Sequence, residues 1–185
     1  MDEIIRILAQ FFDKEKIPYM IAGGQAVLMY GEARFTKDID ITIAMRPESY
    51  RKILDVLPAD FAVDKNNIEE FVMKAWVMPL RHKESEITAD LIFGDTGFES
   101  EAIAQGRKIV KNGYETNFIA PEFLIAQKIF AGRLKDISDA ESIVNIQRKK
   151  LNYGKIEQLL KKLDEELGQN DFIQLWRSII EKNKI

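Results

Sequence analysis

The sequence contains no cysteine and a single histidine, His82, among its 185 residues. The absence of cysteine excludes disulfide bonds, cysteine nucleophiles and thiolate metal sites. One histidine excludes His-rich zinc sites, and the charged neighbours of His82 predict an exposed loop residue. The sequence begins Met-Asp-Glu and continues as an amphipathic helix pattern, which fits neither a signal peptide nor a membrane span. We therefore expect a cytoplasmic protein with no signal peptide and no membrane partner.

Neither positive nor negative charge dominates the whole chain, but the charged residues are unevenly distributed along it. The net charge is -3, yet residues 107–162 carry twelve Lys or Arg against six Asp or Glu. This local excess predicts a basic surface that meets RNA or a triphosphate. An alternative explanation of part of this excess needs no ligand. The cations at 148–150 end a predicted helix, where positive charge complements the helix dipole. The 46% hydrophobic content suffices for one sizeable core, in one or two lobes.

A glycine pair, Gly23-Gly24, joins an apolar segment at 17–22 to a helical segment at 24–30. The first segment predicts a strand, so the two glycines occupy a strand-to-helix turn. Free backbone N–H groups at the start of a helix form a general anion site. The pair therefore indicates a phosphate cradle, although a glycine pair alone also occurs in ordinary turns.

An acidic strand follows at Asp38-Ile39-Asp40-Ile41-Thr42-Ile43. The two carboxylates take one parity and the isoleucines take the other, which is the period of a half-buried strand. Two like charges on one face repel each other unless a cation or full solvation compensates them. A divalent ion such as Mg²⁺ prefers carboxylate oxygens and keeps positions open for substrate phosphates. A solvated sheet edge is the alternative interpretation.

The glycine pair, thirteen intervening residues and Asp-x-Asp together resemble the signature of the DNA polymerase beta-like nucleotidyltransferase superfamily. The run Arg34-Phe35-Thr36-Lys37-Asp38-Ile39-Asp40 is similar to that of minimal members, including AbiEii-type toxins of toxin–antitoxin and phage-defence systems. Many members carry Ser after the first glycine, whereas this chain has Gly24 and then Gln25. That departure is shared by the AbiEii-like branch.

The resemblance implies a third carboxylate on a neighbouring strand, and Asp90 supplies it. Asp90 lies alone in the apolar, β-prone run 86–93, where an ionised carboxylate is costly unless it is paired or coordinated. The implied roles are a third ligand for Mg²⁺ or Mn²⁺, with Asp38 and Asp40, and a general base. A strand-end Asp in a local salt bridge is the alternative.

A second block of charged residues lies at 128–139 and is similar to the C-terminal motif of the superfamily. We expect helices at 121–133 and 139–149, with the second capped by Ser138 and with 135–137 as their connection. Phe123, Ala126 and Phe130 form the expected buried face, which leaves Lys128 off it. Taken with the glycine turn, the resemblance implies nucleotide contacts at Gly23, Gly24, Thr36, Lys37, Lys128, Arg133, Lys135 and Asp136. A solvated helix surface explains the charges of this block equally well, and Asp139 fits a helix first turn.

The predicted fold is α/β (α+β), a mixed nucleotidyltransferase sheet flanked by helices and followed by a helical lobe. We expect a catalytic lobe at 1–119 and a helical lobe at 120–185 that completes the active-site groove. The other predicted elements are helices 3–15, 47–57, 97–104, 153–167 and 171–182, strands 38–44, 71–79 and 86–93, a short extended piece at 61–63, and a hairpin at 106–111 and 114–118.

The predicted reaction is metal-dependent transfer of a nucleoside monophosphate from a nucleoside triphosphate to an acceptor hydroxyl. The resemblance implies tRNA or a protein as acceptor and a cognate antitoxin as partner. Two alternatives stay open, an aminoglycoside-type small-molecule nucleotidyltransferase and a non-catalytic module that binds nucleotides or a partner. The sequence does not identify the acceptor or the nucleotide.

Overall fold

The computed structural model describes residues 1–63 and 65–183, and they form two compact units. The first unit consists of Met1–Gln25 and Phe35–Ile119. The second consists of Ala26–Arg34 together with the chain from Ala120 onward. The chain therefore passes between the units three times, and a nine-residue segment from the first part of the sequence belongs to the second unit. The predicted roles of the segments 1–119 and 120–185 remain predictions.

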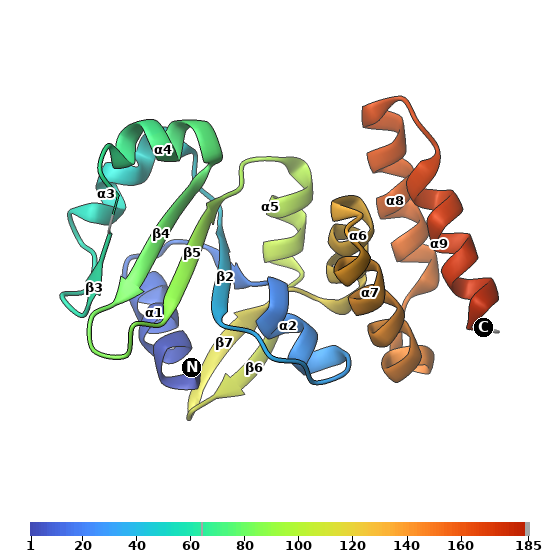
Figure 1. Cartoon of the computed structure of the whole chain (residues 1–185), viewed down its shortest axis with the longest axis horizontal. Coiled ribbons are helices and arrows are strands. Elements are labelled where there is room, and N and C mark those ends of the chain that lie inside the picture. Colours follow the sequence, from blue (N-terminus) through green and yellow to red (C-terminus); the bar gives the residue numbers. More distant parts are fainter. Residues whose placement is uncertain (64, 184–185) are drawn as a thin grey trace. The chain divides into compact units, whose positions relative to one another are not determined.

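Within the described residues, seven strands form one mixed sheet, which belongs to the first unit (Figure 1). The strands are β1 (Tyr19–Ile21), β2 (Asp38–Ile43), β3 (Phe61–Ala62), β4 (Val77–His82), β5 (Thr88–Phe93), β6 (Arg107–Lys111) and β7 (Tyr114–Phe118). Their spatial order is β3-β4-β5-β2-β1-β7-β6. The pairs β2–β5 and β1–β7 are parallel, and the other pairs are antiparallel. The sheet confirms the predicted mixed α/β fold.

The helices of the first unit cover the sheet and connect its strands. They are α1 (Asp2–Lys14), the start of α2 (Gly23–Tyr30), α3 (Tyr50–Leu54), α4 (Ile68–Ala75) and α5 (Gly97–Ala104). Helix α1 contacts β6 and β7, α4 contacts β4, and α5 contacts β1 and β2. The apolar stripe of α1 is buried as its spacing predicts, with Phe12 and Leu8 fully covered.

Strand β2 shows why the acidic side of the sheet stays accessible. Ile39, Ile41 and Ile43 are fully buried, whereas Asp38 is exposed and Asp40 is half-buried. The three isoleucines face the core, and because side chains alternate along a strand, both carboxylates lie on the opposite face. The position of the acidic face follows from burying three isoleucines.

The second unit is helical and has its own core. Its elements are α6 (Pro121–Ala131), α7 (Leu134–Gln147), a 3₁₀ turn at Arg148–Lys150, α8 (Tyr153–Leu167) and α9 (Asp171–Lys182). Helix α6 contacts α7, α8 and α9, and α8 also contacts α9 (Figure 1). Asn152 caps α8 by accepting from the N–H of Lys155 at 3.0 Å. The buried carboxylate of Asp164 accepts from the N–H groups of Phe172 and Ile173, which fixes the start of α9.

The predicted strand at 71–79 is wrong in its first half, because α4 occupies Ile68–Ala75 and β4 begins at Val77. Two glutamates in the first turn favour the helix, and Val72 is the side chain that it buries. Trp76 ends α4 in the left-handed conformation, with φ of 56°. The apolar run alone could not separate helix from strand, since short apolar runs fit both periods.

The second helix of the charged block begins at Leu134 rather than at 139, so the prediction of a 135–137 connection is wrong. Arg133 is the N-cap residue, and Ser138 lies inside the helix instead of capping it. The ion pair between Arg133 and Asp136, three residues apart, supports the earlier start. Asp136 consequently lies in the first turn of α7, where a carboxylate is favoured by the helix dipole.

His82 is buried at the end of β4, so the prediction of an exposed loop residue is wrong. Its Nδ1 lies 2.9 Å from the hydroxyl of Ser85, and its ring packs edge-on against Phe61. Within the described part of the chain, no helix combines the length and the apolar character needed to cross a membrane.

Candidate active site

The glycine turn fits tightly against the acidic strand. Gly23 has φ of +55°, a left-handed conformation that glycine adopts without the strain of a Cβ atom, and it begins α2 one residue after β1 ends. A Cβ atom on Gly23 would lie 1.7 Å from Oδ2 of Asp40. A Cβ atom on Gly24 would lie 2.4 Å from the hydroxyl oxygen of Thr36. The backbone of the turn therefore touches two side chains of the predicted site.

The N–H groups in the first turn of α2 have no partner within the helix, which makes them available to an anion. Gln25 also lies in the first turn of α2, its side chain is buried, and its Nε2 has no hydrogen-bond partner among the described residues. Sequence reasoning noted Gln25 only as a departure from the superfamily pattern. The burial of Gln25, which distinguishes it here, cannot be read from the sequence.

The three predicted metal carboxylates come from two adjacent parallel strands. Asp40 of β2 pairs with Asp90 of β5, and Asp38 pairs with Thr88 one step earlier. Residues two apart on a strand share a face, so all three carboxylates lie on the half-exposed face of the sheet. The hydroxyl of Thr88 donates to Oδ1 of Asp38 at 2.6 Å. Thr88 was not predicted, because nothing in its spacing distinguishes it from an ordinary strand threonine.

Burial raises the pKa of the Asp90 carboxyl, and the neighbouring charges of Asp40 and Asp38 raise it further. The positive charge of Lys65 lowers it by a smaller amount. The carboxylates thus repel one another as the alternation predicts. An accessible cation between them would remove both the repulsion and the desolvation penalty.

The chemistry of these donors fits a hard divalent ion. Asp38, Asp40 and Asp90 offer only carboxylate oxygens, which suit Mg²⁺ or Mn²⁺ and exclude a thiolate or imidazole site. In residues 1–63 and 65–183, no group of three or more acidic, His or Cys side chains is already arranged around one ion position. The assignment of these three residues as ligands therefore stays a prediction, supported by their shared face and their mutual repulsion.

The same face continues onto β4. Pro79 lies opposite Asp90, and Val77 lies opposite Ile92. These three apolar side chains are only half-buried, so the sheet surface beside Asp90 on the β4 side is partly open to solvent.

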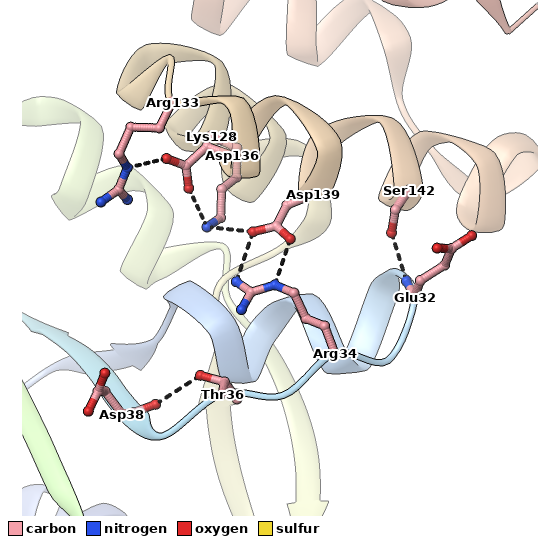
Figure 2. Close-up of polar contacts among 9 residues, drawn as sticks. All are labelled: Glu32, Arg34, Thr36, Asp38, Lys128, Arg133, Asp136, Asp139 and Ser142. Atoms are coloured by element: carbon pink, nitrogen blue, oxygen red, sulfur yellow. Dashed lines mark hydrogen bonds and ion pairs between the residues drawn. The ribbon is translucent and has the colours of Figure 1, made fainter.

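A separate buried charge cluster lies inside the second unit (Figure 2). Nζ of Lys128 lies 2.8 Å from Oδ1 of Asp136 and 3.0 Å from Oδ2 of Asp139, and all three residues are at most 6% exposed. Arg133 donates to the second oxygen of Asp136 at 2.5 Å, while most of its own side chain is in solvent. Lys128 is therefore buried, contrary to the expected helix face, and Phe130 of that face is 50% exposed.

Arg34 completes this cluster from the segment 26–34. Its Nε and Nη2 donate to the two oxygens of Asp139 at 2.7 and 2.9 Å, a bidentate ion pair. Burial works to raise the pKa values of the Asp136 and Asp139 carboxyls, but the hydrogen bonds from Arg133, Arg34 and Lys128 outweigh it and hold both values below the ordinary range. The alternative of a simple first-turn Asp139 does not describe this residue, which is buried and paired twice.

The predicted site residues thus divide between the two units. Gly23, Gly24, Thr36, Lys37, Asp38, Asp40 and Asp90 belong to the first unit, and Lys128, Arg133, Lys135 and Asp136 belong to the second. Lys37 and Lys135 are exposed. Their predicted nucleotide contacts, like that of Lys128, stay predictions.

The model of a family described as "Nucleotidyl transferase of unknown function (DUF2204)" matches residues 1–171. No curated protein matches the sequence. The solution structure of the antibiotic-resistance factor ANT(2″)-Ia is 18% identical, with 91% of this chain and 95% of that chain covered and a TM-score of 0.59.

A second similar structure is that of an antigenic nucleotidyltransferase-like protein from Paracoccidioides brasiliensis. It is 19% identical, with 89% of this chain and 87% of that chain covered and a TM-score of 0.56. At such identities the likeness shows a shared fold, including the helices that follow the sheet.

Proposed function

The chain belongs to the nucleotidyl transferase family whose model spans residues 1–171, and from this premise we propose that it transfers a nucleoside monophosphate to an acceptor hydroxyl in a metal-dependent reaction. The observation that carries the proposal is the pairing of Asp40 with Asp90, with Asp38 on the same face. We also propose that the Gly23 turn binds phosphate, and the close fit of its backbone against Asp40 supports a location beside the carboxylates. We also propose the cytoplasm as its location, since nucleoside triphosphates are supplied there.

In the proposed reaction the acceptor oxygen attacks the α-phosphorus, and the bond from that phosphorus to the pyrophosphate oxygen breaks. Asp90 accepts the proton of the acceptor hydroxyl, a role that its position opposite Asp40 on the proposed metal face supports. The N–H groups at the start of α2 and the Gln25 amide donate to phosphate oxygens. Bound at Asp38, Asp40 and Asp90, Mg²⁺ supplies positive charge that offsets the negative charge developing on the phosphates. Pyrophosphate leaves with the negative charge.

Lys128, in the charge cluster of the second unit, could either bind the triphosphate or hold the neighbouring carboxylates in place. Two of its three N–H donors face Asp136 and Asp139. We therefore propose that Lys128 holds these carboxylates in place, and that the exposed Arg133 and Lys135 are the cations of this block that meet phosphate. In this proposal Lys128 positions the two carboxylates and does not contact the triphosphate. The burial of Lys128 supports this role.

For the acceptor we propose an RNA such as tRNA, or a protein, on the basis of the resemblance to AbiEii-type proteins. A second candidate is a small basic molecule, because the first unit carries 14 Lys and Arg against 19 Asp and Glu. A net negative surface favours a cationic acceptor and disfavours RNA. ANT(2″)-Ia, which shares the fold, has been solved in complex with adenylyl-2″-tobramycin.

The basic residues of the 107–162 segment bear on this choice. In the sheet order, β6 with Arg107, Lys108 and Lys111 is separated from β2 by β1 and β7. These cations therefore lie away from the carboxylates of β2 and β5. Within the first unit, this distribution supports the basic small molecule more than RNA.

One experiment tests the reaction and separates the acceptors. The purified protein is incubated with Mg²⁺ and each α-³²P-labelled nucleoside triphosphate, with total tRNA, with protein alone or with tobramycin. The expected result is label on one acceptor class and release of pyrophosphate, both abolished by Asp38→Ala/Asp40→Ala in a protein that remains folded. Wild-type rates in the doubly substituted protein would reject the carboxylate assignment.

The toxin–antitoxin setting is part of the proposal and has its own test. If the chain is a toxin, its expression in a bacterial host slows growth, and Asp38→Ala/Asp40→Ala at equal protein level relieves the effect. Equal growth of cells that make either protein would reject the toxin role. It would leave the transfer reaction standing.

A further inference from the structure

A cavity of about 290 Å³ lies where β1 begins, and all of its described lining residues belong to the first unit. They come from the end of α1, the start of β1, the end of α5 and the β6–β7 hairpin. The antiparallel pairing of β1 with β2 sets Tyr19 against Ile43, at the end of β2 opposite to Asp38. The cavity is therefore distinct from the carboxylate site proposed for the transfer reaction.

Asn117 provides a buried hydrogen-bond acceptor of fixed orientation in this cavity. It is 6% exposed, and its Nδ2 donates to the carbonyl oxygens of Tyr19 and Ile103 at 2.7 and 3.1 Å. These two bonds use both N–H donors of the amide and leave Oδ1 as an acceptor. A Cβ atom on Gly106 would lie 2.4 Å from Oδ1. Because Gly106 also lines the cavity, its lack of a side chain keeps the space beside Oδ1 open.

Tyr19 adds a second buried polar group to the lining. It is 3% exposed, and its hydroxyl has no hydrogen-bond partner among the described residues. Burial raises the pKa of this hydroxyl, and the negative charge of Asp13, another lining residue, raises it further. The hydroxyl therefore stays protonated and can donate. A buried donor of this kind is stabilised by a ligand that accepts from it.

Two exposed side chains of opposite charge complete the polar lining. Lys108 pairs with Asn117 across the β6–β7 ladder, so their side chains share a face. Asp13 accepts from the hydroxyl of Tyr114 through Oδ2 at 2.7 Å, which leaves its Oδ1 for another donor. The remaining walls are apolar and consist of Ile17, Pro18, Ile103 and Ala104.

The lining thus offers acceptors for a cationic donor, donors for an anion, and an apolar wall. A cavity slightly smaller than about 300 Å³, the lower limit for drug-sized ligands, suits a molecule as small as an amino acid. We propose that this cavity binds a free α-amino acid with an aliphatic side chain. Its ammonium group lies at Asn117 and Asp13, its carboxylate at Lys108 and the Tyr19 hydroxyl, and its side chain against the apolar wall.

The test uses L-leucine and two analogues that each lack one of its charges, L-leucinamide and 4-methylpentanoate. Binding is followed by ¹H–¹⁵N NMR titration of the full chain, without nucleotide or metal. L-leucine is expected to shift the backbone signals of residues 103–108 and 117 and to leave those of 38–40 and 88–90 in place. Each analogue should bind about tenfold more weakly or worse, because each loses a charge-assisted hydrogen bond.

Substitutions at the exposed rim test the assignment of each charge. Lys108→Met should weaken L-leucine by about tenfold and leave L-leucinamide unchanged. Asp13→Asn should weaken L-leucine by a similar factor and leave 4-methylpentanoate unchanged. The matched control is Lys74→Met, at an exposed position of α4 in the same unit, which should alter none of the affinities.

Three results would overturn the proposal. They are no binding of L-leucine to the wild-type protein, signal shifts outside the cavity, and unchanged L-leucine affinity in Lys108→Met. Equal affinities for L-leucine and L-leucinamide would reject a free amino acid and indicate the N-terminus of a peptide instead. Because binding is the readout, each of these outcomes leaves the proposed nucleotidyl transfer to its own test.

Discussion

Asp40 and Asp90 lie directly opposite each other on the parallel strands β2 and β5, on the half-exposed face of the sheet. Paired positions on one face bring side chains within about 5 Å, so two ionised carboxylates there destabilise the sheet. A protein keeps such a pair where a cation compensates it. The same pair of carboxylates should therefore lower the stability of the metal-free sheet and bind the proposed metal ion.

Asp40→Asn should stabilise the metal-free protein while it abolishes transfer. Removing one like charge opposite another is worth about 0.2–1 kcal/mol, a rise of roughly 1–4 °C in unfolding midpoint for a chain of this size. Thermal unfolding in EDTA and the labelled-transfer assay measure the two effects. Asp60→Asn, at an exposed position of the same unit, serves as control and should alter neither. A lower midpoint for Asp40→Asn would contradict the repulsion.

Mg²⁺ binding should strengthen as pH rises from about 4 through the pKa of Asp90. Burial and the charges of Asp40 and Asp38 raise that pKa, so the metal-free protein holds a proton on Asp90 at pH values where an exposed Asp has lost it. Metal binding must displace this proton and is therefore weaker at low pH. Calorimetry in two buffers of different ionisation enthalpy detects the released proton. Asp90→Asn should bind weakly, without proton release.

Gly23→Ala should destabilise the protein more than Gly113→Ala does. Both residues have positive φ, +55° and +77°, so alanine incurs about 1–2 kcal/mol of backbone strain at each. Only at Gly23 does the new Cβ collide with Asp40, whereas nothing lies within 4 Å of Gly113. Urea unfolding should show the extra loss, and transfer should fall only for Gly23→Ala. Equal effects on unfolding and transfer would show that the turn does not position Asp40.

Lys128→Met should cost about 3–5 kcal/mol of stability, because it leaves the carboxylates of Asp136 and Asp139 buried with fewer partners. Lys161→Met is the matched control on the same unit, since Lys161 forms an exposed pair with Glu157 at 3.8 Å and should cost less than about 0.5 kcal/mol. A stable Lys128→Met protein that has lost nucleotide affinity would instead support a direct phosphate contact.

The charge cluster should also make the second unit sensitive to acid. The pKa values of Asp136 and Asp139 are lowered, so their stabilisation is complete above the unfolded value of about 4 and is lost as pH falls through the lowered values. Unfolding free energies measured from pH 6 to pH 2.5 should therefore fall most steeply below about pH 4. The double variant Asp136→Asn/Asp139→Asn should start lower and show a shallower decline. An equally steep decline in both proteins would place the acid sensitivity elsewhere.

The acidic strand β2 and the neighbouring strand β5 with Asp90 could be predicted, because the patterns that identify them lie within a few residues of each other in the sequence. Alternation alone determines that Asp38 and Asp40 share a face, and a lone Asp90 in an apolar strand is conspicuous because burying a charge is costly. The register that sets Asp40 against Asp90 is not local, since it depends on the packing of β5 beside β2.

The residues that sequence reasoning missed are bound to distant partners. Arg34 and Asp139 are 105 residues apart, and neither spacing nor charge pairs them in advance. The burial of Lys128 was missed because α6 is covered on more sides than its apolar stripe indicates. Helix α4 was mistaken for a strand because a short apolar run fits both periods. In each case the tertiary environment, rather than the local pattern, decides.

The position of segment 26–34 in the second unit has a consequence for how the chain folds. Glu32, Arg34 and Tyr30 contact Ser142, Asp139 and Gln147, which follow them by 105 to 117 residues. During synthesis these residues emerge long before their partners exist, so the second unit can close only after most of the chain has been made. Such long-range closure slows folding, because chain entropy is lost before the contacts form. Expressing residues 120–185 alone would therefore give helices that lack one of their own packing segments.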